Sequence, residues 1–415
     1  MRNASTSVPR VTDPERSAAC WMIALAAMFA GEPAVEAQTR VDAVPVTIAI
    51  LYEGRRVYVP VAAASGPLGW FILDTGADDS LIDTTVSDRV GVRVLAEETV
   101  HGAGRGSLTV GRTDATTLYV GSTPLRLDSA EVASLDARLT PYSGRHIGGL
   151  IGSQFFREHV VTVDFDQRRL ELRNPRTFDY HGSGLRSAFR LVDGVPIVAG
   201  AITLPDGSSL PLRLLVDLGA DANLLVSGRF VSAHPALARL APSIVEPLGA
   251  GVGGETRYAF TRLPKLQVGP ISASDLVVGL SENGTLRGGA YDALLGAQFL
   301  QRYRVTFDYA HGEIIFEPNP RAKPDAFDRS GAYLIEDSKA PHRLTIHFVA
   351  KGSPAAEAGL APGDVVRTID GRDAGARTLA EIREALTSDD HAAVPITVER
   401  AGRPIDTVLK LRDLL

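Results

Sequence analysis

The sequence is poor in cysteine, methionine and aromatic residues, and these shortages limit the chemistry that the protein can perform. Its 415 residues include one cysteine and three methionines, and 6% are aromatic. The cysteine, Cys20, lies in an N-terminal stretch with the features of an export signal. After cleavage of that stretch the chain would contain no disulfide and no thiol nucleophile. An exported chain without cysteine is compatible with a bacterial periplasm.

Several other patterns are also missing from the sequence. The formal net charge is −6 and no long basic block occurs, which argues against nucleic acid as a partner. The nine histidines form no cluster with metal-ligand spacing, so neither a metal nor another cofactor is expected. The G-x-S-x-G motif of serine hydrolases and the P-loop are absent as well.

The N-terminus predicts export from the cytoplasm. Three arginines precede the apolar stretch Ala18–Ala30, and Val35-Glu36-Ala37 offers a small-x-small cleavage pattern. The apolar stretch of about 13 residues is too short to span a bilayer comfortably, and no other run is longer. We therefore expect residues 1–37 to be a signal peptide and the protein to be periplasmic or secreted, without a membrane span. An uncleaved leader or a start codon placed too far upstream are the alternatives.

Two similar stretches place an aspartate after an apolar run. Residues 71–82 read F-I-L-D-T-G-A-D-D-S-L-I and contain Asp74, and residues 212–226 read L-R-L-L-V-D-L-G-A-D-A-N-L-L-V and contain Asp217. A charged group at the end of a buried strand is costly unless it is paired, hydrogen-bonded or used in chemistry. Both aspartates are therefore candidates for a functional site.

Further landmarks recur at nearly the same offset along the chain. The glycine-rich segment 101–106 is matched by 249–254, and G-L-I-G-S-Q-F-F at 149–156 is matched by A-L-L-G-A-Q-F-L at 293–300. Each of the latter two is followed by a segment that predicts a strand, Val160–Leu172 and Val305–Phe316. The order and spacing predict two homologous lobes. Lobes related by a pseudo-twofold axis bring equivalent positions, here Asp74 and Asp217, close to that axis.

The composition favours a mainly β fold of several domains. Forty glycines, 25 prolines and short apolar runs are typical of β structure. We expect a hairpin at Val46–Val61 with its turn at Glu53-Gly54, and a helix at Leu379–Leu386 in a C-terminal α+β module. The predicted divisions are residues 1–37 (signal), 43–176 (N-terminal lobe), 185–320 (C-terminal lobe), 321–330 (linker) and 331–415 (C-terminal module).

Two carboxylates a few ångströms apart cannot both ionise easily, so one pKa rises and the pair shares a proton. Such a pair can hold a water molecule: the ionised member takes a proton from the water, which attacks a carbonyl carbon. The protonated member stabilises the developing oxyanion. Gly76 and Gly219 would let the backbone approach the carboxylates closely.

The segment F-I-L-D-T-G-A-D-D-S-L-I resembles the active-site segment of retroviral-type and pepsin-type aspartic proteases. L-I-G at 150–152 and L-L-G at 294–296 resemble the second signature of that family. The resemblance implies two β-barrel-like lobes, a polypeptide substrate, a catalytic monomer and one catalytic aspartate from each lobe. It further implies support of the pair by neighbouring residues, and flaps over the cleft. The support residues are Thr75, Gly76, Leu218 and Gly219, and the flap candidates are Gly102, Gly104, Gly106, Gly251 and Gly253.

The second motif departs from the family pattern. The family places Thr or Ser after each catalytic aspartate, and the two hydroxyls form hydrogen bonds across the lobes; Thr75 fits this pattern and Leu218 does not. The loss of one such bond costs about 1 kcal/mol. A peptide-binding protein that has lost turnover is therefore the alternative function. Asp78, Asp79 and Asp221 are either local turn partners or ligands of the substrate.

The run G-S-P-A-A-E-A-G-L-A-P-G-D-V-V-R-T-I-D-G at 352–371 resembles bacterial PDZ domains. The resemblance implies that the C-terminal module adds a peptide C-terminus as a strand, either to tether substrate or to regulate access. The loop that binds the peptide carboxylate would be Gly331-Ala332-Tyr333-Leu334. Alternatively, the module only docks against the lobes and captures no peptide.

Overall fold

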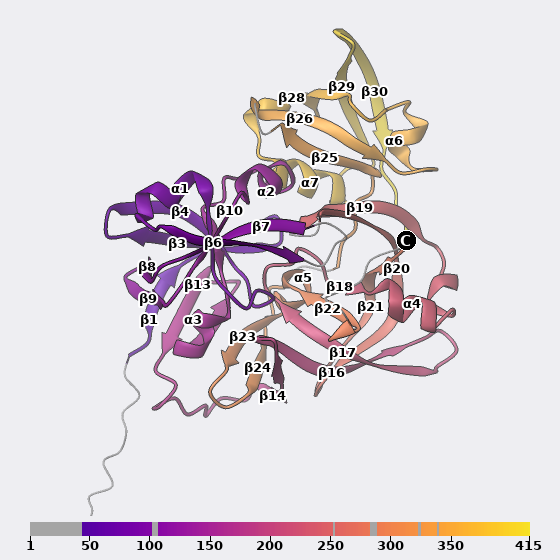
Figure 1. The fold of residues 1–415 in the computed structure, drawn as a ribbon. Helices are drawn as coiled ribbons and strands as arrows, with labels where there is room; N and C mark the ends of the chain where they lie inside the picture. The colour runs from indigo at the N-terminus through magenta and orange to yellow at the C-terminus, as the bar shows by residue number, and fades with distance from the viewer. Residues whose placement is uncertain (1–43, 102–106, 252–253, 283–288, 323–324, 338–339) are drawn as a thin grey trace, which may run out of the picture. The chain divides into compact units, whose positions relative to one another are not determined.

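The computed structural model describes residues 44–101, 107–251, 254–282, 289–322, 325–337 and 340–415. The predicted signal peptide lies outside these residues and stays a prediction. Within the described part, no helix is long and apolar enough to cross a membrane. The fold is mainly β, as the sequence predicts, and it is built from four sheets and a few short helices (Figure 1).

A ten-stranded sheet forms the N-terminal lobe, with strand order β6-β7-β10-β5-β11-β4-β3-β8-β9 and β2 paired to β3. Helices α1 (Thr84–Val90), α2 (Asp136–Ser143) and α3 (Ser153–Glu158) lie between its strands in the sequence. The strands are β2 (Leu51–Glu53), β3 (Arg56–Ala63), β4 (Gly66–Leu73), β5 (Leu81–Asp83), β6 (Val94–His101), β7 (Ser107–Thr113), β8 (Thr116–Val120), β9 (Thr123–Leu127), β10 (Glu131–Ala133) and β11 (Gly149–Ile151).

An eight-stranded sheet forms the C-terminal lobe, with strand order β15-β16-β17-β22-β18-β21-β20-β19. Its helices are α4 (Gly228–Ala233) and α5 (Ala297–Leu300), with a short 3-10 turn at Leu237–Arg239. The strands are β15 (Arg190–Val192), β16 (Val195–Thr203), β17 (Ser209–Asp217), β18 (Leu224–Val226), β19 (Ile244–Gly251), β20 (Gly254–Val268), β21 (Ile271–Ser281) and β22 (Ala293–Gly296).

Both lobes use one strand arrangement around the aspartate. In the N-terminal lobe β11 pairs in parallel with β4 and antiparallel with β5. In the C-terminal lobe β22 pairs in parallel with β17 and antiparallel with β18. The glycine signatures predicted at 149–152 and 293–296 are these central strands. Each strand therefore lies beside the one that delivers the aspartate of its own lobe.

A six-stranded sheet joins the lobes, with strand order β1-β13-β12-β23-β24-β14. At its centre β12 of the first lobe pairs with β23 of the second, where the hydroxyls of Thr162 and Thr306 form a buried hydrogen bond of 2.8 Å. The strands are β1 (Val46–Ala49), β12 (Val160–Asp164), β13 (Arg169–Arg173), β14 (Leu185–Ala188), β23 (Tyr303–Asp308) and β24 (Glu313–Pro318).

This sheet corrects two expectations about local structure. The segments 160–172 and 305–316 are hairpins and not single strands, because Asp164 and Asp308 accept turn-forming hydrogen bonds from the backbone N–H groups of Gln167 and His311. The predicted hairpin at 46–61 is shorter than expected: β2 and β3 form it, whereas β1 pairs with β13 in the joining sheet.

The C-terminal module has its own sheet, with strand order β25-β26-β27-β29-β30 and β28 paired to β27. Its strands are β25 (Ala332–Asp337), β26 (Ala340–Val349), β27 (Val365–Ile369), β28 (Arg372–Asp373), β29 (Ala393–Arg400) and β30 (Arg403–Lys410). Helix α6 (Pro354–Glu357) precedes β27, and α7 (Leu379–Thr387) confirms the predicted helix: Leu379, Ile382 and Leu386 are buried on one face.

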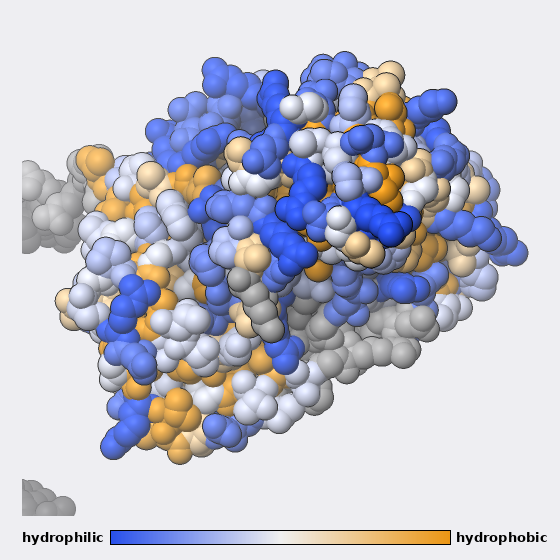
Figure 2. Space-filling view, turned by 90° about the horizontal axis from the view of Figure 1, so that it is seen from above, coloured by the Kyte–Doolittle hydropathy of each residue, from blue (hydrophilic) through white to orange (hydrophobic). Residues whose placement is uncertain are grey.

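One hydrophobic core is continuous between the two lobes, and the C-terminal module has a core of its own. A further cluster joins the module to the C-terminal lobe, where Ala350 packs with residues such as Tyr258. The largest fully buried side chains, such as Phe71, Phe156 and Phe307, pack in the shared core of the lobes. Large exposed hydrophobic residues, such as Val94, Leu185 and Val408, are scattered over different elements. On the face shown in Figure 2, hydrophobic residues are mixed with hydrophilic ones.

Candidate active site

The two aspartates lie at corresponding ends of their strands. Asp74 follows β4, and its N–H donates to the carbonyl of Ile151 on β11 (2.9 Å). Asp217 is the last residue of β17, opposite Gly296 in the β17–β22 register. Each position is therefore fixed by the glycine-signature strand of its own lobe, as the recurring motifs predict.

The side chains of Asp74 and Asp217 are hydrogen-bonded to each other. Each carboxylate also accepts a 2.8 Å hydrogen bond from the backbone two residues later, Asp74 from Gly76 and Asp217 from Gly219. A Cβ at Gly76 would lie 2.6 Å from the carboxyl carbon of Asp217, and one at Gly219 would lie 2.5 Å from that of Asp74. Both positions therefore require glycine for the carboxylates to meet.

The electrostatics of the pair are set mainly by burial. Asp217 is 8% exposed, whereas Asp74 is partly exposed. Burial, followed by the neighbouring charge of Asp74 and the hydrogen bond to it, raises the pKa of Asp217 well above its ordinary value. Two carboxyl groups in contact share a proton, and these causes favour Asp217 as its site.

Gly152 and Gly296 position the loops that follow the aspartates. A Cβ at Gly152 would lie 2.4 Å from the carbonyl oxygen of Asp79, and one at Gly296 would lie 2.3 Å from that of Ala222. The next residues, Ser153 and Ala297, donate from their N–H groups to the equivalent loops, each at 2.9 Å. The second signature is therefore a place where the backbone passes directly behind the aspartate loop.

Hydrogen bonds between the lobes are present on one side of the pair. The hydroxyl of Thr75 donates to the carbonyl of Val216 (2.8 Å) and accepts from the N–H of Leu218 (2.9 Å). Leu218 is fully buried and packs in the shared core. Thr75 thus makes the contact that the family resemblance implies, and Leu218 replaces its counterpart with apolar packing.

The acidic residues after the aspartates all have partners within the chain. Asp221 forms an ion pair with Arg56 of the N-terminal lobe (3.1 Å), and Arg56 also donates to the carbonyl of Gly219 (3.4 Å). The carboxylate of Asp79 accepts from the side chain of Gln154, and that of Asp78 accepts from the N–H of Asp79. The contact of Asp78 is local, as the turn-partner interpretation expects, whereas Asp79 and Asp221 are held by residues distant in the sequence.

Sequence reasoning missed two charged residues near the site. Arg56 is the first residue of β3 and precedes an apolar run, and nothing in that pattern indicates a partner in the other lobe. Glu131 on β10 is 9% exposed, and burial, followed by the charge of Asp79, raises its pKa to about 7. Among the described residues no group of three or more His, Cys, Asp and Glu side chains could hold a metal ion.

The flap candidates fall mostly outside the described residues. Gly102, Gly104, Gly106 and Gly253 lie there, and their role in flaps stays a prediction. The flanking strands are antiparallel hairpins, β6–β7 with His101 opposite Ser107, and β19–β20 with Gly251 opposite Gly254. The glycine-rich segments therefore connect paired strands in both lobes.

The predicted carboxylate-binding loop already has partners within the chain. The N–H of Gly331 donates to the side chain of Asp328 (2.5 Å), and the N–H of Ala332 donates to the hydroxyl of Ser330 (3.0 Å). Tyr333 and Leu334 belong to β25 and pair with β26.

Comparison with known families agrees with this geometry. Residues 59–155 match the aspartyl protease family, and residues 347–400 match the PDZ domain family. The chain combines an aspartyl protease domain with a PDZ domain. The protease match includes Asp74 and Gly152 but does not extend to Asp217, whose motif carries Leu218. No curated protein matches the chain.

Proposed function

We propose that the protein is an aspartic endopeptidase whose catalytic pair is Asp74 and Asp217. The observation that carries this proposal is the hydrogen bond between these two carboxyl groups, one from each lobe. The two glycines that allow this contact, Gly76 and Gly219, have no room for a side chain. The match of residues 59–155 to the aspartyl protease family supports peptide hydrolysis as the reaction of this pair.

In the proposed mechanism Asp217 holds the shared proton and Asp74 is ionised. Asp74 accepts a proton from a water molecule held between the carboxyl groups, and the water oxygen bonds to the peptide carbonyl carbon. Asp217 donates its proton to the carbonyl oxygen, which gives a tetrahedral diol. Asp74 then returns a proton to the amide nitrogen, the C–N bond breaks, and Asp217 regains its proton from the diol.

We propose further that the protein acts as an exported monomer. Both lobes needed for the pair lie in one chain, and their matching strand arrangement is the one that a duplication would produce. The PDZ domain suggests that polypeptide ends are ligands or that access of substrate is regulated. Periplasmic or secreted localisation rests on the N-terminal pattern alone.

A peptide-binding protein without turnover is the second candidate, and Leu218 is the observation that favours it. The two functions are separated by incubating the purified chain with an unfolded protein between roughly pH 3 and pH 7. Cleavage that is blocked by a statine-type transition-state mimic and lost in Asp74→Asn supports the protease. Binding of the mimic without any cleavage supports the binding protein.

A further inference from the structure

The peptide-binding groove of a PDZ domain lies between an edge strand and a helix. In this chain the edge strand is β25, which stands at the end of the PDZ sheet, and the helix is α7. A ligand peptide would pair with β25 and contact α7 on its other side. The occupancy of the space between these two elements therefore decides whether the domain can take a peptide.

Arg383 crosses this space. It extends from α7 and donates to the carbonyl of Leu334 on β25 (2.7 Å), and it also donates to the carbonyl of Tyr142 at the end of α2 (2.7 Å). Its guanidinium lies 5.1 Å from the ring centroid of Tyr333. One side chain thus links both walls of the groove to the N-terminal lobe.

The end of α2 contacts both walls of the groove. Gly144, the left-handed cap of this helix, is so close to α7 that a Cβ there would lie 2.8 Å from the Cβ of Leu379. The same Cβ would lie 3.1 Å from a carboxylate oxygen of Glu336 on β25. The ring of Tyr142 lies 6.4 Å from that of Tyr333. Tyr142–Gly144 therefore fills the position between β25 and α7.

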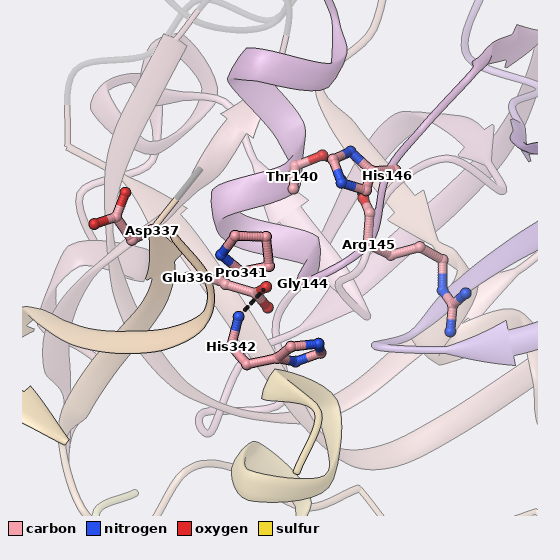
Figure 3. A pocket seen from close by; sticks show the side chains of 8 residues that line it. All are labelled: Thr140, Gly144, Arg145, His146, Glu336, Asp337, Pro341 and His342. Atoms are coloured by element: carbon pink, nitrogen blue, oxygen red, sulfur yellow. Dashed lines mark hydrogen bonds between the residues drawn. The ribbon is translucent and has the colours of Figure 1, made fainter. Parts of the chain in front are cut away.

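The same junction reaches the C-terminal lobe. His347 on β26 contacts Glu255 on β20 (2.5 Å), and its ring lies 6.1 Å from the ring of Tyr142. Figure 3 shows the small pocket beside the junction, which is lined by Thr140, Gly144, Arg145 and His146 of the N-terminal lobe and by Glu336, Asp337, Pro341 and His342 of the PDZ domain. The PDZ domain thus touches both lobes at the point where its groove is filled.

We propose that the PDZ groove is occupied by the chain's own segment Tyr142–Gly144, so that docking on the protease lobes and binding of a free peptide exclude each other. The hydrogen bonds already made by Gly331 and Ala332 fit this state, because those N–H groups are engaged within the chain. Regulation of proteolysis by this contact rests on the proposed protease function. The occupancy itself does not.

The test is hydrogen–deuterium exchange of the full chain with a substitution in the lobe and a readout in the PDZ domain. Gly144→Ala places a Cβ against Leu379, and should speed amide exchange in β25 and the start of α7 about tenfold, as expected when charge-assisted hydrogen bonds are lost. Gly91→Ala is the matched control: Gly91 is also a left-handed helix cap, and a Cβ there would meet nothing within 4 Å.

Unchanged exchange in β25 and α7 with Gly144→Ala would overturn the proposal, since an empty groove would not sense a substitution in another domain. A second variant tests the latch, by which we mean the hydrogen bonds from Arg383 to Leu334 and Tyr142. Arg383→Ala should speed exchange at residues 142–146 of the lobe. Arg377→Ala should not, because Arg377 precedes α7 and its side chain donates to the Glu381 carbonyl of that helix. Equal exchange in the two variants would contradict the latch. Neither readout requires proteolysis.

Discussion

The two lobes deliver their aspartates by the same strand arrangement, but they differ in what surrounds the carboxyl groups. The N-terminal motif contributes Thr75, whose hydroxyl bonds across to the other lobe, whereas the C-terminal motif contributes the buried Leu218. The N-terminal carboxyl, Asp74, is partly exposed, whereas Asp217 is buried. The lobes therefore give two chemically equivalent residues different environments, which favours a fixed site for the shared proton.

The turns that reach across to the opposite lobe differ in the same way. The β2–β3 hairpin brings Arg56 to Asp221 of the C-terminal lobe. The β15–β16 hairpin instead brings Gly194 to Asp78 of the N-terminal lobe. A Cβ added at Gly194 would lie 3.0 Å from the Cβ of Asp78. Beside the aspartates, the N-terminal lobe thus supplies both the threonine hydroxyl and the arginine that bond to the C-terminal lobe. We expect substitutions in this lobe to have the larger effects.

Removing either carboxylate should have the largest effect. Asp74→Asn eliminates the base and Asp217→Asn eliminates the acid, and each should lower kcat/KM by about 10²–10⁴-fold, the range typical of general acid–base groups. Asp206→Asn is the control, since Asp206 holds only its own exposed turn through Ser208. The measurement is cleavage of a fluorogenic peptide. Retention of full activity in either active-site variant would remove that residue from the mechanism.

The pH dependence should reveal the asymmetry of the pair. Burial and the charge of Asp74 raise the pKa of Asp217, so its proton is present below that raised pKa and is lost as the pH rises through it. Above it, kcat/KM should fall about tenfold per pH unit, and at lower pH protonation of the second carboxyl should give the acid limb of a bell. A kcat/KM that keeps rising into the alkaline range would contradict a shared proton.

The candidate site could be predicted from the sequence because its parts are local patterns. Asp74 ends an apolar run, and Gly76 and Gly152 stand where the backbone packs too closely for a side chain. The recurrence of the pattern around Asp217 predicted the partner. Arg56 and Arg383 could not be predicted, since each acts on a residue far away in the chain and neither belongs to a recurring spacing.

The same local reasoning explains the expectations that were wrong. A continuous apolar–polar pattern at 160–172 favours one strand, but the turn within it depends on the side chain of Asp164. Likewise, the pattern of β1 indicates a strand without indicating its sheet, which is set by pairing with the distant β13. Strand type follows from side-chain alternation, whereas strand partners follow from the packing of the whole lobe.

Breaking the ion pair between the lobes should destabilise the protein. Arg56→Ala leaves the carboxylate of Asp221 without its partner at a largely buried site, and should lower the free energy of unfolding by about 3 kcal/mol. Arg262→Ala is the control: its partner Asp275 is mostly exposed, so the loss should stay below about 1 kcal/mol. Urea unfolding measures both. Equal losses of unfolding free energy in the two variants would show that the Arg56–Asp221 ion pair stabilises the protein no more than an exposed pair does.

The smallest expected effect comes from restoring the missing hydroxyl. A hydroxyl at position 218 would face the N-terminal motif as that of Thr75 faces the C-terminal one, so Leu218→Thr should raise kcat/KM about fivefold, the worth of one hydrogen bond. Because Leu218 is fully buried in the core, the same change should lower stability by about 1–2 kcal/mol through lost apolar packing. Thr75→Val is the matched control: it removes the existing bonds and should lower both activity and stability. If Leu218→Thr leaves kcat/KM unchanged while Thr75→Val lowers it, the hydroxyl on the N-terminal side is sufficient for this pair.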